Sequence, residues 1–299
     1  MPDRRSSARW WSSRCWSAAW RSGCTAAPAD RPPAGTGAAA GCWTSRVQYR
    51  HAPAANHAAL DAVLASAPGR PTLPVRLTVE LAGRARAHLP ADAPLTVWDP
   101  CCGAGVTLTV LGLLVPGITR LVGTDADPEP LDLARRNLAL LDPGGLAARA
   151  ADLDALAARH DKPSYADAAT AARTLVPAST PAWSVAVADA RDTAAVRGVL
   201  AEASPDDAGP DLVLADLPHG IRTTWAAAPT RPAGAAADTP APGVEFLRAV
   251  ATVLRPDAVV VAVGRGRTVA LPPGVRPLER VRVGHRAAVL VRAGALRDD

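Results

Sequence analysis

The stretch from residue 97 to residue 127 constrains the fold of this chain more than any other part of its sequence. It contains a short apolar strand, a loop of sequence Asp-Pro-Cys-Cys-Gly-Ala-Gly that begins at Asp99, a helix, and a second strand that ends at Asp125. Strand, glycine loop, helix and strand in this order are typical of a nucleotide-cofactor site on a doubly wound α/β sheet. The sequence therefore predicts a parallel sheet with a cofactor loop after its first strand.

The two acids that end these strands distinguish between two kinds of cofactor. A dinucleotide-binding loop would have a third small residue where Leu108 stands, and the acid at Asp99 would face a pyrophosphate of like charge. S-adenosylmethionine instead offers an ammonium group that can pair with Asp99 and two ribose hydroxyls that can donate to Asp125. The pattern favours S-adenosylmethionine over a nicotinamide dinucleotide.

We expect the cofactor to lie in the loops that follow the first three strands. Asp189 ends the third expected strand and is placed to accept a hydrogen bond from the adenine amino group. Asp192 could do the same, or both acids could cap a helix. The expected cofactor contacts are Asp99, Cys101, Gly103, Gly105, Asp125, Ala126, Asp189 and Ala190.

Short apolar runs alternate with helical stretches along the chain, which is the pattern of a parallel α/β fold. Only a tight Gly284-His285 turn separates the last two runs, so these form a hairpin rather than a crossover. We expect a Rossmann-like methyltransferase fold: a mostly parallel seven-stranded sheet that ends in an antiparallel hairpin, with helices on both faces. The expected strands are residues 95–99, 121–125, 185–189, 212–216, 259–263, 277–283 and 286–292.

The expected helices follow from apolar residues at helical spacing and from capping signals. One helix should begin at Asp127, which can cap it, with Pro128 at its first position. A Pro/Ala/Gly-rich loop over residues 226–242 is expected near the site. The other expected helices are residues 54–65, 75–89, 104–115, 193–203 and 244–255.

Composition and hydrophobic periodicity divide the chain into three parts. Residues 1–46 hold five of the eight Trp residues without any helical or alternating period, which predicts a disordered extension. The alternatives are an RNA-binding arm and a targeting peptide. Residues 47–94 predict an N-terminal helical segment packed on the catalytic domain. Residues 95–299 predict the methyltransferase domain, with a helical insertion at 142–183 that is broken at Lys162.

Charge and cysteine usage limit the classes of function. Residues 1–50 hold eight Arg and two acidic residues, a local charge of +6, whereas the rest holds 25 basic and 26 acidic residues. Only local arginine clusters can therefore support nucleic-acid binding. The five cysteines lack metal-ligand spacing, so we expect no metal, and a reducing cytoplasm is the expected location. No apolar run approaches the roughly 18 residues of a membrane span.

A second motif, Asp216-Leu217-Pro218-His219-Gly220, closes the fourth expected strand. Ligands of open α/β sheets bind beyond the carboxyl ends of the strands, so this loop should face the glycine loop. The carboxylate of Asp216 and a carbonyl beside Pro218 can accept hydrogen bonds from N–H groups of a substrate, and the ring of His219 can stack on a base. Such alignment supplies much of the rate of a methyl transfer. The alternative is a surface turn with an incidental histidine.

These residues resemble a known family. The Asp216-to-His219 motif is similar to the Asp/Asn-Pro-Pro-aromatic signature of methyltransferases that act on amino groups of nucleic acids, from which it departs at Leu217 and at His219. The chain resembles more closely the AviRa-type ribosomal RNA methyltransferases of avilamycin (orthosomycin) resistance, from about Tyr49 to the C-terminus. The matching stretches are residues 66–69, 74–77, 98–103, 108–114, 137–141, 162–165, 216–218 and 288–293.

The resemblance implies methylation of a guanine base in large-subunit ribosomal RNA, with Asp99, Gly103 and Asp125 on the cofactor. It also implies that Asp216, Pro218 and the ring at position 219, where the family has Tyr, hold the base. The resemblance also implies resistance to orthosomycin antibiotics. We further expect the protein to be a monomer.

Contacts to RNA are expected at Arg76 and at the Arg265/Arg267 pair, with the target base unpaired or flipped. Two alternatives remain at this point: a small-molecule N- or O-methyltransferase of a biosynthetic cluster, and a non-catalytic RNA-binding relic.

Overall fold

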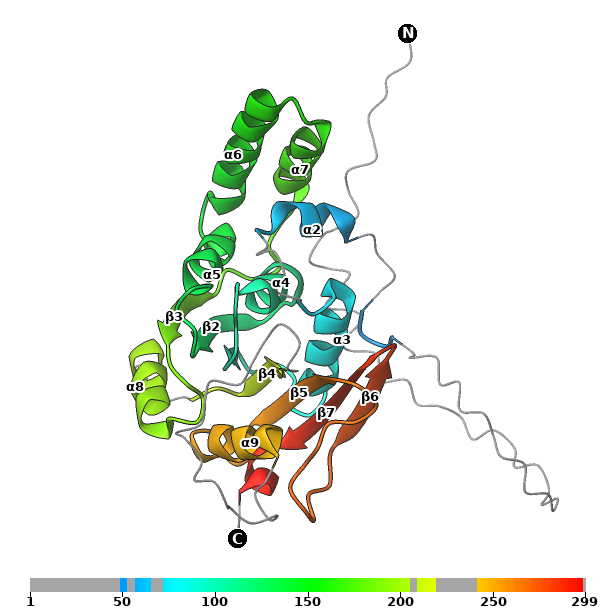
Figure 1. Cartoon of the computed structure of the whole chain (residues 1–299), viewed down its shortest axis with the longest axis vertical. Coiled ribbons are helices and arrows are strands. Elements are labelled where there is room, and N and C mark those ends of the chain that lie inside the picture. The colour runs from blue at the N-terminus through cyan, green and yellow to red at the C-terminus, as the bar shows by residue number, and fades with distance from the viewer. Residues whose placement is uncertain (1–48, 53–56, 66–71, 205–208, 219–240, 298–299) are drawn as a thin grey trace, which may run out of the picture. The chain divides into compact units, whose positions relative to one another are not determined.

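Seven strands form one sheet in the order β3-β2-β1-β4-β5-β7-β6 (Figure 1). Strands β1 to β5 pair in parallel, whereas β7 is antiparallel to both β5 and β6. The predicted fold class, a mostly parallel sheet that ends in an antiparallel hairpin, is confirmed. The strands are β1 (Leu95–Asp99), β2 (Ile118–Asp125), β3 (Ala182–Val187), β4 (Leu212–Asp216), β5 (Val259–Arg265), β6 (Glu279–Val283) and β7 (Arg286–Arg292).

This computed structural model describes residues 49–52, 57–65, 72–204, 209–218 and 241–297, all within the unit Val47–Asp299. The expected extension over residues 1–46 lies outside the described residues. So do His219 and nearly all of the loop expected at 226–242.

Helices cover both faces of the sheet because side chains alternate along each strand. On β2, Leu121 lies against α4 at Gly112, whereas the next residue, Val122, belongs to the apolar cluster beneath α8 and α9. Helices α3, α4 and α5 form the first layer, and α8 and α9 form the second. The helices are α2 (Ala58–Val63), α3 (Val75–Arg86), α4 (Val106–Leu114), α5 (Leu131–Leu138), α6 (Gly145–His160), α7 (Pro163–Thr174), α8 (Thr193–Ala203) and α9 (Pro242–Thr252), with short 3₁₀ turns η1 (Ala139–Leu141) and η2 (Ala293–Leu296).

Two element boundaries differ from the prediction in ways that affect the site. Helix α5 begins at Leu131 rather than after Asp127. The reason is a local turn, in which Asp127 Oδ1 accepts a hydrogen bond from Glu129 N at 3.0 Å. Strand β3 ends at Val187 because its pairing with β2 stops there, so Asp189 lies beyond the strand. Both shifts lengthen the loops at the carboxyl edge of the sheet.

Residues 142–183 form a pair of antiparallel helices that pack on each other, α6 and α7 (Figure 1). They break where expected, since Asp161 has a φ of 48° and Pro163 occupies the first position of α7. Helix α2 packs on α7.

A buried acid ties the segment before α2 to α3. Glu80 accepts hydrogen bonds from the backbone N–H groups of Arg50, His51 and Ala52 at 2.7–3.0 Å and from Arg84 Nε at 2.7 Å. These four bonds outweigh the cost of burial, so the pKa of Glu80 lies below its ordinary value. Arg84 Nη1 also donates a hydrogen bond to Glu279 on β6, and this bond joins α3 to the hairpin. Among the described residues, no helix is long and apolar enough to cross a membrane.

Candidate active site

The carboxyl ends of β1, β2 and β4 bring three acids, Asp99, Asp125 and Asp216, to one edge of the sheet. The glycine loop is hydrogen-bonded to all three strands. Gly103 N donates to Asp125 Oδ2 at 2.8 Å, and Cys102 N donates to the carbonyl of Thr124 at 2.9 Å on β2. Cys101 N donates to Asp99 Oδ1 at 3.1 Å, and its Sγ donates to the carbonyl of Asp216 at 3.4 Å. The loops expected to hold cofactor and substrate are thus directly connected.

The two glycines of the loop are required for different reasons. Gly103 has a φ of 50°, and a Cβ built on it would meet nothing within 4 Å, so its surroundings leave space for a ligand. Gly105 has a φ of 71°, and its Cβ would lie 3.0 Å from the Cα of Ala134 on α5. Gly105 therefore allows α5 to approach the loop, whereas Gly103 allows a ligand to approach the backbone.

Asp99 is a buried carboxyl group suited to a cationic partner. Its side chain is almost wholly enclosed, with 2% of the residue exposed. Its pKa is raised to about 8, mainly by burial; the charges of Asp125 and Asp216 contribute to the rise, and the N–H of Cys101 opposes it. An ammonium group beside Asp99 would restore its charge, as expected for the amino-acid end of S-adenosylmethionine.

The outer end of the expected cofactor site is formed by Asp125 and Asp189. Asp125 also accepts a hydrogen bond from Asp127 N at 3.0 Å, so both of its oxygens are oriented by backbone N–H groups. Asp189 accepts from Arg191 Nε at 3.1 Å and Nη2 at 2.7 Å, and these bonds lower its pKa. Asp192 caps α8 by accepting from Ala195 N. Of the two acids left open by the sequence, Asp192 is a helix cap.

The adjacent cysteines pack as small residues within the loop. Cys102 is buried, and its Sγ would lie 3.0 Å from a Cβ on Gly123 of β2. Burial, aided by the nearby acids, raises the pKa of both thiols well above the ordinary value. Both therefore stay protonated near neutral pH, which does not suit a nucleophile. Among the described residues, no three His, Cys, Asp or Glu side chains form a metal-binding group.

The acceptor side contains a residue that the sequence motif did not reveal. Arg286, the first residue of β7, places its Nη1 2.7 Å from Oδ1 and 2.9 Å from Oδ2 of Asp216. Its Nη2 donates to the carbonyl of Thr72, just before α3. The available signal was the hairpin turn, which returns β7 to the edge where β5 ends, with Arg286 opposite Arg265.

Leu217 departs from the nucleic-acid methyltransferase signature for a structural reason. Its N–H donates to the carbonyl of Val263 at 2.8 Å, and its side chain is buried in the cluster beneath α9. Pro218 follows, partly buried, at the end of the described segment. The stacking role expected for His219 concerns a residue outside the described part of the chain.

The three arginines expected to contact RNA differ in their surroundings. Arg76 lies over the ring of Tyr49 at 3.9 Å and donates to the carbonyl of Ala52. These contacts give Arg76 a role in holding the segment before α2. Arg265 ends β5 and Arg267 lies in the turn after it; both are exposed, and Gly266 N between them donates to the carbonyl of His285.

A buried amide, Asn137 of α5, is a second residue that the sequence reading missed. Its Nδ2 donates to the carbonyls of Ala65 and of Ala104 in the glycine loop, and its Oδ1 accepts from Ala65 N, each at 2.8 Å. A polar residue within the apolar stripe of α5 was the available signal. Asn137 therefore connects Ala104 in the glycine loop to Ala65, two residues after α2.

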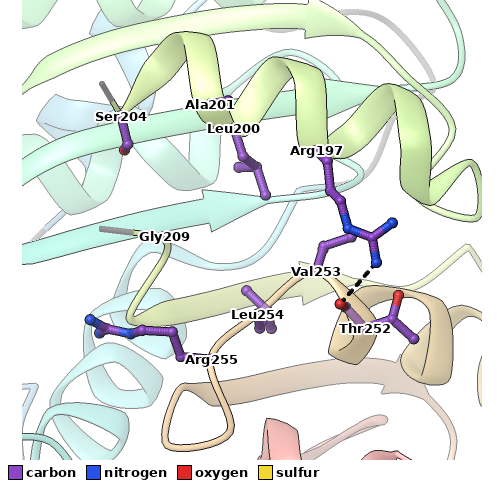
Figure 2. A pocket seen from close by; sticks show the side chains of 9 residues that line it. All are labelled: Arg197, Leu200, Ala201, Ser204, Gly209, Thr252, Val253, Leu254 and Arg255. Carbon is purple, nitrogen blue, oxygen red and sulfur yellow. Dashed lines mark hydrogen bonds between the residues drawn. The ribbon is translucent and has the colours of Figure 1, made fainter. Parts of the chain in front are cut away.

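A separate cavity of about 380 Å³ lies at the opposite edge of the sheet, where β4 and β5 begin (Figure 2). The C-terminal half of α8 and the turn after α9 form its walls, and Arg197 Nη2 donates across it to the carbonyl of Thr252. No expected site residue lines this cavity.

Comparison with known proteins identifies the family. The model of the rRNA methyltransferase AviRa family matches residues 47–286. The chain belongs to this family. A curated relative from Streptomyces viridochromogenes, named 23S rRNA (guanine(2535)-N(1))-methyltransferase, is 43% identical over 254 residues, which are 82% of this chain and 96% of the relative.

Two solved structures of the rRNA methyltransferase aviRa from Streptomyces viridochromogenes share this fold. They are 41% and 40% identical to the chain, with TM-scores of 0.70 and 0.69, and each match covers 83% of this chain and 97% of that one. The resemblance seen in the sequence is therefore confirmed, and the protein is a member of a family of methyltransferases.

Proposed function

We propose that this protein transfers a methyl group from S-adenosylmethionine to N1 of a guanine in large-subunit ribosomal RNA. The observation that carries the proposal is the junction of the two loops, where Cys101 Sγ donates to the carbonyl of Asp216. The loop that fits the cofactor thereby lies against the loop that fits an N–H substrate. The reaction named for the 43% identical relative supports the choice of guanine N1.

The residues present fit S-adenosylmethionine. The buried Asp99 suits its ammonium group, the open backbone at Gly103 suits its close approach, and Asp125 suits its ribose hydroxyls. Ala126, Asp189 and Ala190 would border the adenine, with Arg191 holding the Asp189 carboxylate in place. When bound, the cofactor supplies an electrophilic methyl group on its sulfonium sulfur.

Asp216 would act on the acceptor base. Arg286 Nη1 lies between the two oxygens of its carboxylate, and an outer lone pair can accept a hydrogen bond from guanine N1–H. This places N1 at the edge where the cofactor loop lies and gives the N1 proton an acceptor as the new N–C bond forms. The target base must leave its stack to reach a strand end below the protein surface.

Arg265 and Arg267 would hold the RNA backbone on the hairpin side of the site. Both are exposed, and their turn is hydrogen-bonded to the hairpin that carries Arg286. Phosphate contacts of this kind position the substrate and weaken with salt. We place the enzyme in the cytoplasm as a monomer, and resistance to orthosomycins would follow if the methylated guanine lies in their binding site.

The test is transfer of labelled methyl groups to large ribosomal subunits from a strain that lacks the modification. We expect incorporation into the large-subunit RNA and none into the small-subunit RNA, which serves as the matched control. Cofactor binding without incorporation into RNA would contradict the proposal, and transfer to a small molecule instead would indicate a biosynthetic methyltransferase. Expression in a sensitive host, with inhibitory concentrations of avilamycin measured, tests the resistance role.

A further inference from the structure

The ion pair between Asp216 and Arg286 joins parts of the chain that are 70 residues apart. The two side chains are 17% and 16% exposed, so water screens the pair less than it would on an open surface. One guanidinium nitrogen contacts both carboxylate oxygens, and another is held by the carbonyl of Thr72. Arg286 is thus fixed at both ends, by its strand and by the segment before α3.

This geometry restricts the orientation of the carboxylate. An Asp side chain at a strand end can turn about its last bond, but contact of both oxygens with Nη1 fixes the plane of the group. Because Nη1 is within hydrogen-bond distance of both oxygens, it lies between them, and the outer lone pair of each oxygen points away from it. Pairing with Arg286 is therefore compatible with a hydrogen bond from one base N–H to an outer lone pair.

The pair also places a positive charge beside Asp216 in a site that holds other acids. Asp99 on β1 places a second acid near Asp216, and the thiol of Cys101 lies on its carbonyl. A neighbouring acid disfavours the ionised form of a carboxyl group, whereas a guanidinium at 2.7 Å favours it. Among the described residues, Arg286 is the cation that the structure pairs with Asp216.

We propose that Arg286 is a positioning residue for methyl transfer, which holds the Asp216 carboxylate ionised and in one orientation for the N–H edge of the target guanine. The role rests on the function proposed above. Arg286 acts through Asp216 and orients it by a contact present before any substrate binds. It thereby lowers the cost of ordering this carboxylate during catalysis.

The experiment compares R286A, R286K and R267A with the wild type, using large-subunit RNA as substrate. R286A should lower kcat about 100-fold and leave the dissociation constant for S-adenosylmethionine within about twofold, because the cofactor loop does not contact Arg286. The acid limb of its pH–rate profile should move upward by about one pH unit. R286K retains a cation and should recover about tenfold of the lost rate.

R267A is the matched control, since it removes an exposed arginine of the neighbouring turn. It should raise KM for the RNA and leave the pH profile unchanged. An acid limb of R286A at the wild-type position, or an equal loss of cofactor binding, would overturn the positioning role.

A measurement without turnover separates this inference from the proposed function. In protein labelled with ¹³C at the Asp carboxyl carbons, the Asp216 signal should titrate about one pH unit higher in R286A than in the wild type. An unchanged midpoint would refute the inference even if the wild type methylates the RNA. If the wild type transfers no methyl group to RNA, the proposed function fails. A shifted midpoint of Asp216 in R286A would then show that Arg286 keeps Asp216 ionised but has no role in methyl transfer to RNA.

Discussion

The proposed cofactor side and the proposed acceptor side of this site are built in different ways. On the cofactor side, backbone N–H groups of the glycine loop donate to Asp99 and Asp125, and both partners lie within one strand–helix–strand unit. On the proposed acceptor side, Asp216 pairs with Arg286, a side chain of β7 that is 70 residues away in the sequence. The cofactor side is therefore determined by local sequence, whereas the acceptor side depends on the tertiary fold of the C-terminal hairpin.

The largest expected effect separates the two sides by function. D216A should lower methyl transfer by about 1000-fold or more, because it removes the proposed acceptor of the base. The dissociation constant for S-adenosylmethionine should stay nearly unchanged, because Asp216 lies outside the loops proposed to hold the cofactor. D125A should instead weaken cofactor binding, since it removes both a ribose acceptor and the partner of Gly103. Calorimetry with the cofactor and methyl-transfer rates check both. Loss of cofactor binding in D216A would contradict the separation of cofactor-side and acceptor-side residues.

The second expected effect tests how the glycine loop is built. G105A should lower the free energy of unfolding by about 2–4 kcal/mol, because a Cβ there meets the α5 backbone at a left-handed φ. G103A should cost only about 1 kcal/mol, the price of the φ alone, and should weaken cofactor binding. Denaturant unfolding and calorimetry measure the two. Equal destabilisation by both substitutions would contradict the different roles of the two glycines.

The third prediction concerns pH. Asp99 stays protonated up to about pH 8 in the folded protein but ionises near pH 4 when unfolded, so the folded state binds more protons between these values. Its contribution to stability is therefore present at low pH and lost as the pH rises from about 4 to about 8. Cofactor affinity should rise up to about tenfold per unit from about pH 6 to about pH 7.5, since the ammonium binds the ionised form.

The control for this pH effect is D99N, which keeps the shape of the side chain and removes the titration. Its cofactor affinity should be weak and nearly independent of pH over the same interval. Wild-type affinity that stays flat with pH would contradict the assignment of Asp99 to the ammonium.

The smallest expected effect distinguishes the two acids after β3. D189A should raise the cofactor dissociation constant about tenfold, because a partner of the adenine is lost. D192A should leave binding unchanged and lower the free energy of unfolding by about 1 kcal/mol, the usual cost of losing a helix cap. Equal cofactor affinity in both variants would contradict the proposed contact of Asp189 with the adenine.

The sequence predicted the parts of the molecule that depend on local patterns. The seven strands, the hairpin and the loop between Asp99 and Asp125 follow from apolar periodicity and turn residues. The start of α5 was predicted three residues too early, because the local turn at Asp127 competes with helix capping. Apart from Arg84, which follows Glu80 by four residues, the partners of the Asp216, Glu80 and Asn137 side chains described above lie 28 to 72 residues away, so no local signal identifies them.

The central claim is that the loop at Asp216 presents a guanine N1 to the cofactor, and reverse transcription of the treated RNA tests it most directly. Methylation at N1 removes a Watson–Crick donor and stops the polymerase one nucleotide before the modified base. We expect a single cofactor-dependent stop at one guanine of large-subunit RNA with the wild type and none with D216A. No stop despite cofactor binding, or the same stop with D216A, would contradict it.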